Sequence, residues 1–180
     1  MSNIRLTTSR LEQLRDKLRV RGQRPSMVAP GGRNSQDVIE SAQIAEEWGA
    51  FCEAMYLMMA ADRRVLNVER EVLRGALAVL SGDRVRTRHM ESMLDLAARN
   101  IARDGAEKRT QKVIEALRED PARAESVVIC AAAIAAADQQ MDPAEQELLD
   151  RLVKGLNVSQ ARADEILKEL EADLGESPQK

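Results

Sequence analysis

Two segments of the sequence carry the same pattern, AADRRVLNVE at residues 60–69 and AADQQMDPAE at residues 136–145. In each, an aspartate follows two alanines, an apolar residue comes three positions later, and a glutamate comes seven positions after the aspartate. The match extends outward through apolar pairs, with Met58, Leu73 and Leu80 corresponding to Ile134, Leu149 and Leu156. This duplication predicts two helix–corner–helix units whose inner helices face each other.

The composition predicts an all-α protein. Hydrophobic residues make up 44% of the 180 residues and charged residues 32%, whereas aromatic residues make up only 2%. The dominant types, Ala, Leu, Glu and Arg, are good helix formers, and alternating β-branched runs are nearly absent. Apolar spacing and cap signals predict helices over 36–61, 68–80, 90–101, 113–117, 121–137, 142–154 and 159–174. The helix over 121–137 is apolar on almost every face, which predicts a central position.

Three longer segments, MAADRRVLNVEREVL, IAAADQQMDPAEQELL and LNVSQARADEILKEL, resemble the tellurite-resistance TerB-like family. That resemblance implies a compact bundle of about seven helices, here over residues 36–175. We expect residues 176–180, which follow Gly175, to be a frayed tail. It also implies an association with metal and metalloid stress. Family members commonly have Asp-Gly at the corner, where this chain has Asp62-Arg63 and Asp138-Gln139. Because glycine supplies a left-handed turn at little cost, its absence predicts a modified corner.

A basic arm precedes this domain. Residues 1–36 carry eight Lys or Arg against two acidic residues, and the rest of the chain has an excess of nine negative charges. A capping box at Ser9 and Glu12 predicts a short amphipathic helix within an arm of residues 1–21, followed by a flexible linker at 22–35 that is rich in Pro and Gly. An isolated helix this short is unstable in water, so we expect it to dock on its own domain, on a partner or on an anionic surface. The residues predicted to bind the partner are Leu11, Leu14, Arg15, Leu18 and Arg19.

The repeated acids support two interpretations. In the first, Asp142 and Glu145 form a capping box after which Pro143 opens a helix, and Glu69 occupies the equivalent place in the first copy. In the second, the two corners converge, and four carboxylates bind Ca²⁺ or Mg²⁺ or receive a basic partner; these are Asp62, Glu69, Asp138 and Glu145. An EF-hand loop is absent from the sequence.

A second basic stretch, DRVRTRH at residues 83–89, contains the only histidine, His89. Its arginines, Arg84, Arg86 and Arg88, are candidates for binding an anion such as phosphate. The lack of aromatic residues among them argues against base stacking and hence against a nucleic-acid partner. The alternatives are a solvated basic loop and a contact with an anionic membrane.

These observations lead to the hypothesis of a non-enzymatic TerB-like binding or scaffold module of bacterial type, in a stress-related or membrane-associated complex with a protein partner. The sequence contains no Walker loop, dinucleotide fingerprint or nucleophile elbow, and no motif points to a small-molecule substrate. Cys52 and Cys130 lie far apart in apolar stretches, which predicts reduced core thiols and a cytoplasmic protein. The alternatives are an adaptor that binds nucleic acid or an anionic membrane through the arm and Arg84–Arg88, and a metal-assisted hydrolase that uses the carboxylates.

Overall fold

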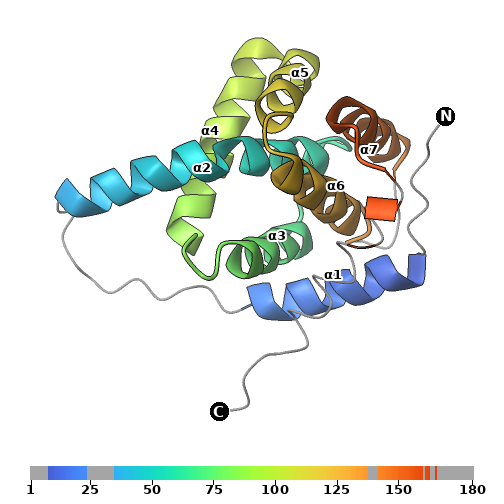
Figure 1. The fold of residues 1–180 in the computed structure, drawn as a ribbon, viewed down its shortest axis with the longest axis horizontal. Helices are drawn as coiled ribbons and strands as arrows, with labels where there is room; N and C mark the ends of the chain where they lie inside the picture. The colour runs from blue at the N-terminus through green and yellow to red at the C-terminus, as the bar shows by residue number, and fades with distance from the viewer. Residues whose placement is uncertain (1–7, 24–34, 138–141, 160, 163–164, 166–180) are drawn as a thin grey trace.

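The computed structural model describes residues 8–23, 35–137, 142–159, 161–162 and 165, and the regular structure of these residues is entirely helical (Figure 1). The helices are α1 (Thr8–Gly22), α2 (Ser35–Met59), α3 (Asn67–Leu80), α4 (Thr87–Asp104), α5 (Ala106–Leu117), α6 (Pro121–Ala135) and α7 (Pro143–Leu156). The all-α prediction is therefore confirmed. The predicted linker falls mainly on residues 24–34, and most of the predicted helix over 159–174 also lies outside the described residues.

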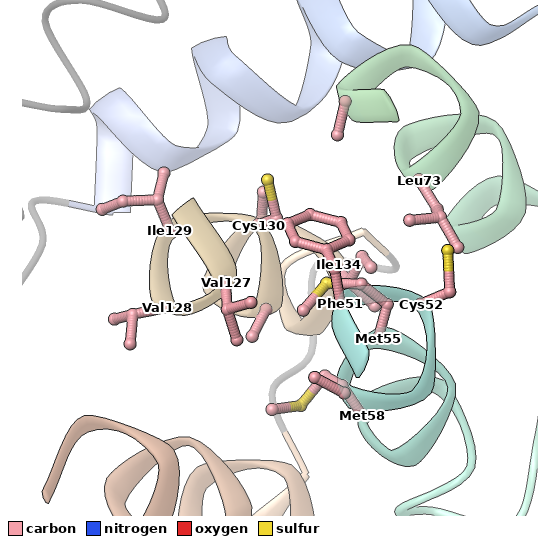
Figure 2. Packing of buried hydrophobic residues seen from close by; sticks show 14 of the residues in the cluster. Phe51, Cys52, Met55, Met58, Leu73, Val127, Val128, Ile129, Cys130 and Ile134 are labelled. Carbon is pink, nitrogen blue, oxygen red and sulfur yellow. The ribbon is translucent and has the colours of Figure 1, made fainter. Parts of the chain in front are cut away.

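Helices α2 and α6 form the centre of the fold. Every residue of α6 from Val127 to Ala135 is buried, as its apolar sequence predicts. The large side chains of α2 belong to the same buried cluster as those of this helix, and Figure 2 shows Phe51 and Met55 beside Ile134 of α6. Because five of the nine residues from Val127 to Ala135 are Ala or Cys, the α6 surface is shallow and accommodates the bulk of α2.

The duplicated unit predicted from the sequence is present. The inner helices α2 and α6 contact each other, and each is followed by a short connection and an outer helix, α3 or α7. Corresponding residues have corresponding environments, since Met58 and Ile134 are both buried and so are Leu73 and Leu149. Helices α4 and α5 join the two units and cover α2 (Figure 1).

Local sequence signals start several helices where expected. The Asp120 carboxylate accepts the backbone N–H of Arg123 at 3.1 Å, and Pro121 occupies the first turn of α6. Near the end of the described chain, the Ser159 hydroxyl accepts the N–H of Arg162 at 3.3 Å. These caps satisfy donors that have no partner within their own helix.

Helix α1 is docked on the domain. Its most extensive contact is with α3, and it also touches α6 (Figure 1). Leu14 and Leu18 have no exposed surface and Leu11 is 7% exposed, so all three belong to the main core. Each buried leucine contributes about 1.5–3 kcal/mol relative to an exposed one. The chain's own domain is thus the surface on which the arm helix docks.

Two glycines set the distance between α1 and α3. A Cβ atom on Gly22 would lie 1.8 Å from the carbonyl oxygen of Glu71, and a Cβ on Gly75 would lie 1.9 Å from that of Leu18. Both contacts are with backbone, which cannot turn aside as a side chain can. Gly49 of α2 differs, because a Cβ atom there would have no neighbouring atom within 4 Å. No other described helix packs closely against α2 at Gly49.

Replacing Gly75 with Ala should lower the free energy of unfolding by about 2 kcal/mol or more, because α1 must move away from α3 and leave its leucines poorly packed. The matched variant Gly49→Ala should instead raise it by about 1 kcal/mol, since Ala is the better helix former and the space is open. Urea denaturation of both variants measures the difference. Equal effects of the two substitutions would contradict this account of the crossing.

Candidate functional site

The first corner, between α2 and α3, is a tight turn held by Asp62. One oxygen of the Asp62 carboxylate accepts the backbone N–H of Arg64 at 2.8 Å. Arg63, between them, has a positive φ of 67°. At this corner the expectation of a modified turn is wrong, because the left-handed conformation that glycine favours is kept, with an arginine in it. The corner at Asp138-Gln139 lies outside the described residues. The Asp62 hydrogen bond holds the turn in place of glycine's flexibility.

The two glutamates of the repeat serve as helix caps. Glu69 is 4% exposed, and its carboxylate accepts the backbone N–H of Leu66 at 2.5 Å. Glu145 is 5% exposed and accepts the N–H of Asp142 at 2.8 Å, while Asp142 accepts the N–H of Ala144 at 2.8 Å. The capping interpretation is thus confirmed for both copies, and the second copy adds a polar side chain, Asp142, at the cap position.

The cation site stays a prediction. Asp138 lies outside the described residues, and among the residues described no group of three or more His, Cys, Asp or Glu side chains is placed to hold a metal ion. Glu69 and Glu145 each already bind a backbone donor, so a cation there would compete with a helix cap. One carboxylate oxygen of Asp62 already accepts the backbone N–H of Arg64 in the corner.

The candidate anion site is partly neutralised by α2. The Arg84 guanidinium pairs with Glu47 at 2.9 Å, and Arg88 lies 3.8 Å from Asp37 and 4.0 Å from Glu40. Arg86 is exposed and precedes α4. An anion at Arg84 and Arg88 would have to replace these carboxylates, so anion binding also stays a prediction.

His89 is a buried capping residue. Its Nδ1 accepts the backbone N–H of Arg86 at 3.3 Å at the start of α4, and only 5% of the residue is exposed. Burial and the adjacent Arg88 charge lower the pKa of His89 below its usual value. The neutral ring is therefore the form that caps the helix.

Both cysteines are core thiols, as predicted. Cys52 and Cys130 are buried, and burial raises the pKa of each thiol to about 12. At neutral pH neither forms the thiolate that acts as a nucleophile. Figure 2 shows Cys52 directed toward Leu73 of α3.

Two buried polar contacts were not predicted from the sequence. Glu53 is 7% exposed and receives two hydrogen bonds from the Arg109 guanidinium, at 2.5 and 2.7 Å, which ties α5 to α2. Arg15, 6% exposed, donates to the carbonyl of Ala136 at 2.9 Å. The signal for Glu53 is a lone carboxylate on an otherwise apolar stretch of α2, because a buried charge requires a partner.

The predicted arm residues face the domain. Arg15 reaches the carboxyl end of α6, and Arg19 pairs with Glu71 of α3 at 2.9 Å. The three leucines of the arm helix lie in the core beside these arginines. Their use by an external partner stays a prediction, and it would require α1 to leave this surface.

An apolar groove that was not predicted from the sequence lies between the first half of α2 and α4. Its volume is about 450 Å³, and its lining includes Ile44 and Met93 together with Val38 and Leu96. Val38 is 59% exposed and Leu96 49%, and the adjacent Ile39 is 58% exposed. Two of the four large apolar side chains exposed on the described surface, Val38 and Leu96, thus line this groove. Such a concentration is typical of a binding surface.

The described residues form an all-helical module in which two similar pairs of helices share one apolar core. The sequence pattern of the family "Tellurite resistance protein TerB" matches residues 49–168, and the chain belongs to this TerB family. Helix α1 and the first half of α2 lie outside the matched residues. No curated protein and no solved structure matches the chain. None of the described helices is long and apolar enough to span a membrane.

The substitution Arg63→Gly should raise the free energy of unfolding by about 0.5–1 kcal/mol. A left-handed conformation costs an ordinary residue about 1–2 kcal/mol, and the greater flexibility of unfolded glycine offsets part of the gain. Arg64→Gly, one position further on and also exposed, should lower stability instead. Thermal or urea unfolding of the two variants measures the change in the free energy of unfolding. Stabilisation by both substitutions would contradict the role assigned to Arg63.

The cation prediction is tested by thermal unfolding with millimolar Ca²⁺, Mg²⁺ or Mn²⁺. A cation present at 100 times its Kd should stabilise the protein by about 2.7 kcal/mol. Asp62→Asn should remove this stabilisation, whereas Glu119→Gln on an exposed connection should keep it. An unchanged melting temperature with all three ions would rule the site out.

Proposed function

We propose that this TerB-family protein is a non-enzymatic binding and scaffold module in a stress-response or membrane-associated complex. The observation that carries the proposal is the apolar groove between α2 and α4. Single exposed apolar residues are normal on a protein surface, but here Val38 and Leu96 line the same concave surface, together with Ile44 and Met93. Family membership supports a stress-related setting, because tellurite resistance is the property by which the family is named.

The chemistry of the groove indicates the kind of partner. Its lining is mostly apolar, with His89 among the lining residues, and Arg99 lies exposed at its α4 rim. Arg88 is already close to Asp37 and Glu40 of α2. The occupant that fits is an apolar segment of a protein with an acidic group beside it. The apolar lining provides most of the binding free energy, and the pairing with Arg99 sets the orientation.

The test is a pair of matched surface variants of the full chain. Val38→Asp combined with Leu96→Asp places charges in the groove, while Val20→Asp alters another exposed apolar side chain, 66% exposed, on the outer face of α1. In-cell cross-linking with quantitative mass spectrometry should show the partner lost more than tenfold with the groove variant, since an unpaired buried charge costs several kcal/mol. Val20→Asp should retain it.

Equal recovery of the cross-linked protein with both variants would contradict the proposal. Co-sedimentation with anionic vesicles separates it from the membrane-adaptor alternative. If wild-type protein sediments with the vesicles and Lys17→Glu releases it, the exposed face of α1 that carries Lys17 is the binding surface, and the groove is not.

A further inference from the structure

Helix α1 occupies a groove on the family domain without being part of the matched family region. The groove is formed by α3 and α6, and the leucines of α1 fill it. The family match begins at residue 49, and α1 ends at Gly22. The domain therefore holds an amphipathic helix that reaches it through a separate stretch of chain, residues 24–34.

The groove has a steric requirement. At the crossing with Gly75, the backbones of α1 and α3 are so close that any side chain at Gly22 would collide with the Glu71 carbonyl. A helix in this groove therefore needs glycine at the position of Gly22. The same contact fixes the register of the helix along α3, because displacement by one residue brings a larger side chain to the crossing.

The groove also has two polar contacts that set the direction of the helix. At the middle of α1, Arg15 donates to the Ala136 carbonyl at the end of α6, where the carbonyls lack partners within the helix. At the carboxyl end of α1, Arg74 of α3 donates to the carbonyl of Gly22 at 2.6 Å. A helix lying in the opposite direction would bring its amide end, which has no free carbonyl, to Arg74.

Two carboxylates at the rim of the groove, Glu71 and Asp83, pair with arginines of α1. Arg19 pairs with Glu71 at 2.9 Å, and Arg21 pairs with Asp83 at 2.7 Å. Both pairs are partly exposed, so each adds little stability but favours a basic helix over an acidic one. The apolar floor, the glycine crossing and the two rim carboxylates together describe one kind of ligand.

We propose that the α3–α6 groove is a helix-binding site, that α1 is its intramolecular occupant, and that its external ligand is a basic amphipathic helix of a partner protein. That helix carries leucines at the spacing of Leu11, Leu14 and Leu18, an arginine at the place of Arg15, and glycine at the place of Gly22. This site is separate from the α2–α4 groove, so a negative result for one groove leaves the proposal for the other unaffected.

Tethering makes α1 a competitor that excludes weak ligands. A short tether gives an effective concentration on the order of 1 mM. A free helix with a Kd of about 10 μM for the empty groove would therefore bind the intact chain roughly 100-fold more weakly. Only a helix that is itself held close to the protein, or that binds more tightly than α1, displaces it.

The experiment uses the full chain with a specific protease site introduced within residues 24–34. Cleavage removes the tether while leaving α1 in the sample. The probe is a fluorescent synthetic peptide of residues 8–23, and its binding is followed by anisotropy at increasing dilution of the cleaved protein. The cleaved chain should bind the peptide roughly 100-fold more tightly than the uncleaved chain does, because the tether no longer holds α1 at a high effective concentration.

The control substitutions are made in the synthetic peptide, so they leave the fold of the protein unchanged. A peptide with Gly22→Leu should bind at least tenfold more weakly than the wild-type peptide, whereas Val20→Ser, on the exposed face, should bind equally. The proposal is overturned if the Gly22→Leu peptide binds as well as the wild type, or if the cleaved chain binds neither. Sedimentation of the uncleaved chain as a dimer with exchanged α1 helices would assign the groove to a second copy and overturn the assignment to a partner protein.

Discussion

The packing of α2 against α6 is the contact on which the rest of the structure depends. Helix α6 offers a surface of small side chains, and α2 places Phe51 and Met55 beside it. Because α6 is apolar on all faces from Val127 to Ala135, other helices must cover the faces that α2 leaves, and α1, α3, α5 and α7 do so. The chain duplicates one unit, and the two inner helices meet at the centre of the molecule.

Helix α1 closes the core on one side, although it lies outside the residues that define the family. Its leucines are as deeply buried as those of the central helices, and two glycines bring its backbone into contact with α3. Helix α1 packs tightly against the domain, although a separate segment of chain connects the two. The surface that it covers would also fit an equivalent helix from another protein. This combination makes the surface under α1 a candidate for regulated binding, whereas the α2–α4 groove is open.

The corners have a mainly structural role in the residues described. Asp62 holds a left-handed turn around Arg63, and Glu69 and Glu145 cap the helices that follow. Each carboxylate accepts a backbone donor that would otherwise lack a partner. The hydrogen bonds of these three carboxylates thus account for the shape of the first corner and for the starts of α3 and α7.

Much of the fold could be predicted from the sequence because its signals are local or periodic. The repeat identified the two units, the apolar run at 127–135 identified the central helix, and Asp120 and Asp142 marked helix starts through backbone bonds within one turn. What only the tertiary structure decided are contacts between residues far apart in the chain: the seating of α1 on α3, the pairing of Glu53 with Arg109, and the groove beside Leu96. A glycine such as Gly22 has the same sequence signal whether it ends a helix, loosens a linker or lets two backbones touch. The difference lies in the neighbouring helix, which the local sequence does not specify.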